Sequence, residues 1–265
     1  MTKLKISAAP RSTDPLDYQD LPQEIGAMSK IFTAGSVTPL HSHERDQLLF
    51  ATSGIMRLRT SGDAWIVPRD SAVYIPAGTL HSVGMHGDVD MRTLYIDTSV
   101  AENLAKALSV FSVSNLLREL ILALSEEPVD YGRGSRGDMI AQLIKIEIGH
   151  ARELTLKVPL PKDVRLQRLC AELLANPSDR RTLNDWADVA GASARTLARL
   201  FEQDLGMGFN HWRQRVRLHG ALEALSRGEP IAHVARQHGY LSTSAFSAAF
   251  GKVMGFAPSK AAGEH

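Results

Sequence analysis

The sequence is poor in cysteine and has no long apolar run. Cys170 is the only cysteine among 265 residues, so no disulfide can form within the chain, and zinc sites built from paired cysteines are excluded. No stretch approaches about 18 uninterrupted apolar residues, and the N-terminus lacks the apolar run and cleavage site of a signal peptide. We therefore expect a cytoplasmic protein in a reducing environment, with no membrane partner.

A surplus of charge of one sign is also missing. The 30 Lys+Arg against 29 Asp+Glu leave a net charge of +1, and 44% apolar against 22% charged residues indicates a packed chain. Residues 163–265 carry 13 Lys+Arg and 10 Asp+Glu, and arginine makes up 11 of those 13 positive charges. Arginine suits phosphate and base-edge contacts because its guanidinium is a planar fork of donors. This composition raises the expectation of a nucleic-acid partner only slightly.

Three kinds of pattern follow one another and predict an α+β multidomain protein. From Met28 to Ile96, short apolar segments broken by glycine and proline predict an all-β barrel or sandwich. Two helical stripes follow, from Leu116 to Leu124 and from Met139 to Ile148. Two prolines in Val158–Pro161 then favour an extended segment. We therefore divide the chain into a β-domain, a helical linker and an all-α domain, at residues 1–100, 101–160 and 161–265.

The C-terminal region contains one pattern twice. Ala187 is small where two helices would touch, Gly191 four residues later supplies a tight turn, and Ser193 offers an N-cap to the next helix. The Ala-x₃-Gly pair recurs 48 residues downstream, at Ala235 and Gly239. Each pair is typical of a helix-turn-helix unit.

A family resemblance covers this region from about Arg165 to Ala262. With the closing run Phe246-x₃-Phe250-x₄-Gly255-Phe-x-Pro258, and a helix expected from Phe209 to Ser226 between the units, it resembles the DNA-binding domain of the AraC/XylS family of bacterial transcription regulators. The resemblance implies double-stranded DNA as partner, with two recognition helices in successive major grooves about 34 Å apart. It also implies RNA polymerase as a partner if the protein is an activator. The alternative is an all-α bundle in which the Ala-x₃-Gly pairs are ordinary packing.

The first recognition helix is expected to begin at Ser193. That start places Arg195, Thr196 and Arg199 on its exposed N-terminal face, with the two arginines one turn apart. We expect both arginines to read bases, because bidentate contact of arginine with guanine is the commonest specific contact. A solvated pair of surface arginines is the alternative.

The second recognition helix presents small side chains where relatives often carry glutamine or arginine. We expect it to act through phosphates, van der Waals contact and water rather than through base reading, with Thr243, Ser244 and Ser247 as its candidates. Further candidates for phosphate contact, each with a solvated position as the alternative, are Arg213, Arg215, Arg217, Lys252 and Lys260.

Histidines gather in the β-region. His41, His43 and Gln47 have the same parity, so all three project from one face of an extended strand, and a neighbouring strand could bring His81 opposite. Three imidazoles and an amide oxygen could hold a divalent Zn, Fe, Mn or Ni ion, although the lack of a carboxylate lowers the expected affinity. The alternative is a metal-free pocket lined by the same side chains.

The spacing around these histidines resembles the two cupin motifs. The first runs from Gly35 to Gly54 with Gln47 at the glutamate position, and the second includes Pro76, Gly78 and His81 with its first and last positions altered. The resemblance implies a cupin barrel that senses a small-molecule effector, followed by helices that pair protomers into a homodimer. We expect the stripe from Leu116 to Leu124 to be the dimer interface, with burial against its own barrel as the alternative.

A second function class is a metal-dependent cupin enzyme, such as a dioxygenase or isomerase, with an accessory helical domain. Gln47 in place of the motif's glutamate, the absence of a further acid/base group and the complete second domain argue against it. We therefore expect a DNA-binding transcription regulator and no enzyme.

Overall fold

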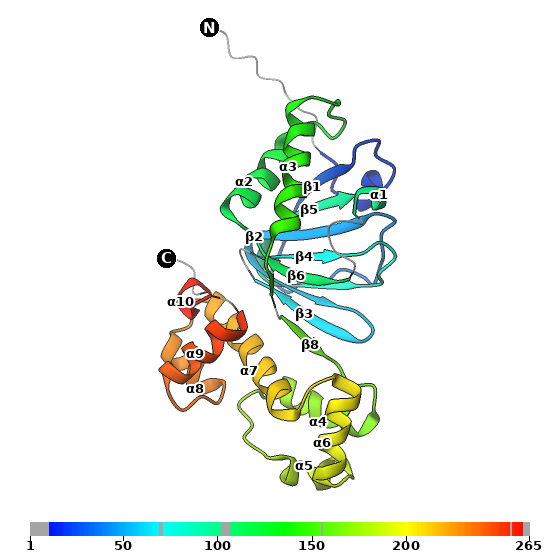
Figure 1. The fold of residues 1–265 in the computed structure, drawn as a ribbon. Coiled ribbons are helices and arrows are strands. Elements are labelled where there is room, and N and C mark those ends of the chain that lie inside the picture. The colour runs from blue at the N-terminus through cyan, green and yellow to red at the C-terminus, as the bar shows by residue number, and fades with distance from the viewer. Residues whose placement is uncertain (1–10, 69–70, 102–106, 155, 255, 262–265) are drawn as a thin grey trace.

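The computed structural model describes residues 11–68, 71–101, 107–154, 156–254 and 256–261. Figure 1 shows a sheet with two helices beside it in the N-terminal part and a group of helices in the C-terminal part. This arrangement confirms the predicted α+β multidomain fold. No helix in the described ranges is both long and apolar enough to cross a membrane.

Eight strands of the described chain form one sheet. The strand order is β1-β5-β2-β4-β6-β7, and β3 pairs with β2 and with β8. The strands are β1 (Ile25–Phe32), β2 (Asp46–Arg59), β3 (Asp63–Val67), β4 (Ser71–Ile75), β5 (Ser82–Ile96), β6 (Ser109–Ser112), β7 (Glu153–Leu154) and β8 (Lys157–Pro159). Two short helical turns accompany them, η1 (Pro15–Tyr18) and α1 (Thr98–Ala101).

Strand β2 separates a cavity from a helical layer. It pairs with β5 along both halves, with β4 at its start and with β3 at its end. Because side chains alternate along a strand, Gln47 and Leu49 line a cavity of about 430 Å³. Leu48 and Phe50 point the other way, into the cluster that includes the apolar faces of α2 and α3.

Helices α2 (Asn115–Glu126) and α3 (Arg136–His150) cover that outer face (Figure 1). Ser114 and Ser135 cap them, as their short side chains accept from backbone N–H groups of the first turn. The stripe predicted as a dimer interface is buried against the sheet from Leu117 to Leu124, and only Leu116 is exposed. The prediction that this stripe pairs protomers is therefore wrong, and the alternative of burial against its own domain holds.

Residues 101–160 also differ from the expected helical linker. Strands β6, β7 and β8 lie in this region and belong to the sheet. Their two to four residues are too short to show alternation, so the sequence pattern did not reveal them. The extended segment expected at the prolines is strand β8, which pairs with β3 through Ala64 and Val158.

The C-terminal part is helical and has two cores. Its helices are α4 (Val164–Ala175), α5 (Leu183–Ala190), α6 (Ala194–Leu205), α7 (Phe209–Ser226), α8 (Ile231–Gln237), α9 (Thr243–Met254) and α10 (Pro258–Ala261). The helix expected from Phe209 to Ser226 is confirmed as α7. Helices α4 to α6 pack around Trp186, Phe201 and Trp212. Helices α8 and α9 instead share one apolar cluster with the sheet and the second half of α7.

Strand β8 and helix α7 join the two parts. The Trp212 indole N–H donates to the Pro159 carbonyl at 2.8 Å, and the Arg215 guanidinium donates to the Lys157 carbonyl at 3.0 Å. Arg57 on β2 forms an ion pair with Glu223 on α7. Helix α7, which connects the two pairs of helices α5–α6 and α8–α9, therefore contacts the sheet directly.

Candidate functional sites

The first helix-turn-helix unit consists of α5 and α6. Thr182 and Asp185 form a capping box at the start of α5. Gly191 ends α5 at φ 63°, a left-handed conformation that costs glycine little. Ser193 then caps α6, because its hydroxyl accepts from the backbone N–H of Thr196 at 3.2 Å. The turn residues thus place α6 as the sequence predicted.

Helix α6 presents two arginines to solvent. Its residues Leu197, Leu200 and Phe201 are buried on the inner side, whereas Arg195 and Arg199 are exposed on the outer side. The Arg199 guanidinium donates to the Gln203 amide oxygen at 2.8 Å, one turn further along. Two exposed arginines on one helix face provide the paired N–H donors that contact guanine O6 and N7 in a major groove.

The second unit repeats this design with α8 and α9. Gly239 adopts φ 79° in the turn, and the Tyr240 N–H donates to the Ala235 carbonyl at 2.9 Å. Phe246 and Phe250 of α9 are buried. On the outer side, Thr243 and Ser244 are exposed, Ser247 is half-buried, and Lys252 is exposed near the end of the helix. Gly255 of the closing run lies outside the described residues.

Three of the five cations expected to contact phosphate have partners within the protein. Arg215 binds the Lys157 carbonyl. Arg217 donates to the Pro177 and Asp179 carbonyls at 2.9 and 2.8 Å. Both it and Arg215 are half-buried, so each connects segments of the protein, and phosphate contact by either stays a prediction. Arg213 donates to the Arg181 carbonyl and stacks on Phe209, but stays half-exposed. The Lys260 side chain lies outside the described part of the chain.

The cavity within the sheet brings the predicted histidines together. Side-chain nitrogens of His41, His43 and His81 all lie within 4.8 Å of one another. An isolated bridge pairs the backbones of His41 and His81. Gln47 lines the same cavity and is buried. The four side chains therefore meet as expected, but the chain bends at Glu44 and Arg45, so His41, His43 and Gln47 do not lie on the single extended strand that the parity argument assumed.

Hydrogen bonds fix the tautomers of two of these imidazoles. The Nδ1 atoms of His41 and His81 lie 2.7 and 2.8 Å from the carbonyl oxygens of Pro39 and Thr79. A carbonyl only accepts, so each Nδ1 carries the proton and each Nε2 keeps a lone pair. Burial, with the neighbouring imidazoles, lowers the pKa of His43 to about 4, and burial also lowers the pKa of His81. Both imidazoles are therefore neutral at pH 7, the state that binds metal.

The donor set fits a divalent ion. Within the described chain, His43 Nε2, His81 Nε2 and Gln47 Oε1 are buried without a hydrogen-bond partner, and buried polar atoms of this kind usually have one. Nitrogens bound tetrahedrally to zinc at about 2.0–2.1 Å lie about 3.4 Å from each other. Because the histidine nitrogens lie within 4.8 Å of one another, binding an ion requires them to approach by up to about 1.4 Å.

Comparisons with known proteins cover both regions of the chain. A model described as a helix-turn-helix domain matches residues 186–263, and one described as a cupin domain matches residues 30–97. The transcriptional regulator NimR of Escherichia coli (strain K12) is 29% identical over 223 residues, which cover 84% of this chain and 81% of NimR. The transcriptional regulator RipA of Corynebacterium glutamicum is 35% identical over 101 residues, 38% of this chain and 30% of RipA. The transcriptional activator RhaR of Klebsiella pneumoniae is 23% identical over 240 residues, 82% of this chain and 85% of RhaR.

The chain belongs to the AraC/XylS family of transcription regulators. It is a DNA-binding regulator with a cupin ligand-sensing domain. Members of the AraC/XylS family regulate transcription, and the relatives found are regulators rather than enzymes. The alternative of a metal-dependent cupin enzyme is therefore wrong.

Sequence reasoning missed two parts of this AraC/XylS-family sensor. Tyr95 on β5 pairs in register with Gln47 and lines the cavity, as do residues 14–16 before β1. Arg45 holds the chain between η1 and β1, because its buried guanidinium donates to the carbonyls of Gln19, Leu21 and Gln23. Arg45 stands inside the first cupin motif, but nothing in that motif indicates which distant carbonyls its guanidinium binds.

Proposed function

We propose that this regulator reads bases mainly through α6 and uses α9 for backbone and shape contacts. The observation that carries the proposal is the contrast between the two exposed faces. Helix α6 shows Arg195 and Arg199, whereas the exposed side chains at the start of α9 are Thr243 and Ser244. Small hydroxyls reach phosphates and waters more readily than they make bidentate contacts with bases.

Selection of bound sequences from a random pool of double-stranded DNA tests this asymmetry. The proposal predicts two half-sites about 34 Å apart, one with strong base preference that includes guanine and one with weak preference. Ser193 and Thr196 are expected to support α6 at the groove edge, while Ser247, Arg213 and Lys252 contact phosphates. Two half-sites of equal information content contradict the proposal.

The second proposal is that the cavity binds a small-molecule effector together with a divalent ion. His41, His43 and His81 would hold Zn, Fe, Mn or Ni, with Gln47 as a neutral fourth donor. The orphaned buried nitrogens support this role. Elemental analysis of protein purified without an affinity tag is expected to find close to one equivalent of metal. Less than about a tenth of an equivalent, unrecovered on adding these ions, contradicts it.

The third proposal is a homodimer formed through the outer face of α3. Met139, Leu143 and Ile146 are spaced so that they share one side of this helix, and they are 62%, 45% and 55% exposed. A second copy of the chain would cover this stripe, which takes the place of the buried stripe on α2. Light scattering of the full chain at micromolar concentration is expected to give twice the monomer mass.

The transcriptional partner completes the proposal. As an activator, the regulator would act on RNA polymerase, and its place would be the cytoplasm, where bacterial DNA lies. Transcription in vitro from a promoter that carries the selected site, with purified polymerase, is expected to rise when the protein is added. A fall in transcript would make it a repressor and would remove RNA polymerase from the proposed partners.

A further inference from the structure

Arg217 lies near the middle of α7 and contacts the segments next to both helix-turn-helix units. Its Nε donates to the Pro177 carbonyl at 2.9 Å, and its Nη2 donates to the Asp179 carbonyl at 2.8 Å. Both carbonyls belong to the loop between α4 and α5, directly before the first unit. The guanidinium therefore connects α7 to that loop through two hydrogen bonds.

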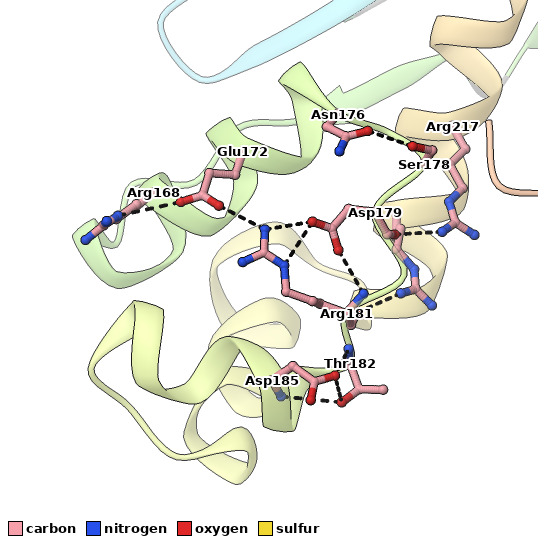
Figure 2. Close-up of polar contacts among 10 residues, drawn as sticks. Arg168, Glu172, Asn176, Ser178, Asp179, Arg181, Thr182, Asp185 and Arg217 are labelled. Atoms are coloured by element: carbon pink, nitrogen blue, oxygen red, sulfur yellow. Dashed lines mark hydrogen bonds and ion pairs between the residues drawn. The ribbon is translucent and has the colours of Figure 1, made fainter. Parts of the chain in front are cut away.

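The loop is well braced on its other side (Figure 2). The Asp179 carboxylate accepts from the Arg181 backbone N–H and from its guanidinium, which also reaches Glu172 at 3.0 Å. The Arg181 guanidinium lies 3.6 Å from the centre of the buried Trp186 ring on α5. Thr182 follows immediately as the N-cap of α5. These contacts fix the loop relative to α5, so a shift of the loop would move the first unit.

The same guanidinium packs on the turn of the second unit. A Cβ built on Gly239 would lie 2.9 Å from the Arg217 Cζ and 3.0 Å from its Nη2. One turn along α7, Gly220 fits closely between the two units, because a Cβ there would meet His238 at 2.7 Å and Pro177 at 3.5 Å. A side chain at position 239 or 220 would therefore displace Arg217 or His238 from this junction.

We propose that Arg217 is a positioning residue that sets the separation and orientation of the two recognition helices, and hence the half-site spacing that this regulator accepts. The inference rests on the proposal that α6 and α9 both contact DNA. Lysine could not replace arginine in this role, since an ammonium lacks the planar fork that reaches two carbonyls while lying flat against a glycine. A phosphate-binding role, in contrast, would tolerate lysine well.

The test compares binding of the full chain to its selected site and to the same site with one base pair inserted between the half-sites. One inserted pair rotates one half-site by about 34–36° and moves it by about 3.4 Å. Wild type is expected to lose at least about tenfold in affinity on insertion. Arg217→Ala and Arg217→Lys are expected to bind the parent site more weakly but to lose only about two- to threefold on insertion.

Arg227→Ala is the matched control, because this exposed arginine at the end of the same helix pairs only with the nearby Glu229 among the described residues. It is expected to keep the wild-type response to insertion. Full recovery by Arg217→Lys, together with a salt slope that falls by about one in Arg217→Ala, would identify a phosphate ligand and overturn the proposal. An unchanged insertion penalty in both Arg217 variants would overturn it as well.

A measurement without DNA separates this inference from the proposed DNA contacts. Ala198 and Ala248 are exposed on α6 and α9, and cysteines introduced there can carry spin labels while the buried Cys170 stays unreactive. In full-length protein diluted with unlabelled chain, wild type is expected to give one narrow distance distribution. Arg217→Lys, which retains the charge, is expected to broaden or shift it. Identical distributions overturn the inference even if α6 and α9 bind DNA as proposed.

Discussion

The buried imidazole of His219 makes the folded protein sensitive to acid. His219 lies on α7 and is 7% exposed. Burial, assisted by the charges of Arg57 and Arg215, lowers the pKa of His219 to about 3. In the unfolded chain the pKa returns to about 6.5. Below about pH 6.5 the imidazole is therefore protonated in the unfolded state, whereas in the folded state it stays neutral until near pH 3. Because the unfolded state binds more protons in this window, the free energy of unfolding falls as pH falls.

The size of the effect follows from that difference. Each pH unit within the window changes the free energy of unfolding by about 1.4 kcal/mol for one such group. Between pH 7 and pH 5, His219 alone should therefore remove about 2 kcal/mol, since only the interval below pH 6.5 contributes. Burial also lowers the pKa of His238, which acts in the same direction.

Urea denaturation of wild type and His219→Gln at pH 7, 6 and 5 measures this loss. The variant is expected to lose about 2 kcal/mol less than wild type between pH 7 and pH 5, whatever its stability at pH 7. His211→Gln serves as control because His211 is exposed on the same helix. If wild type and His219→Gln lose the same free energy, the buried neutral imidazole does not cause the acid sensitivity and the reasoning fails.

Three further predictions concern the cavity, the dimer and the domain junction. Chelator should destabilise wild type by about 2.7 kcal/mol if the ion is present at a hundred times its dissociation constant, whereas His41→Ala should not respond in calorimetry. A chelator without effect on wild type contradicts the metal site. Ile146→Asp should convert the dimer into a monomer in light scattering, and Ile31→Asp, a change at another exposed apolar residue, should not. Trp212→Phe removes the hydrogen bond to the Pro159 carbonyl and should cost about 1–3 kcal/mol in urea denaturation. A change below about 0.5 kcal/mol would show that this bond does not hold β8 to α7.

Local signals predicted the helical part of the fold well. Gly191 and Gly239 mark turns that need a left-handed residue, and Ser193 marks a helix start, because each of these roles depends on a few adjacent residues. The grouping of His41, His43 and Gln47 was predicted from a single extended strand, whereas the chain bends at Glu44 and Arg45 before β2 begins.

Features that depend on distant segments were not predictable. The stripe on α2 is apolar whether it meets another protomer or its own sheet, and only the packing of Leu48 and Phe50 against it decides. Arg215 and Arg217 look like solvated or phosphate-binding cations in the sequence. Their carbonyl partners lie 58 and about 40 residues away, so the fold alone reveals these hydrogen bonds.

The most direct test of base reading by α6 is the affinity of Arg195→Ala for the selected site and for scrambled DNA. The account predicts a loss of about 1–3 kcal/mol on the selected site, relaxed preference at one base pair, and little change on scrambled DNA. Lys252→Ala, as the comparison, should weaken binding to both DNAs alike. An equal loss on both DNAs for Arg195→Ala would contradict the assignment of α6 as the base-reading helix.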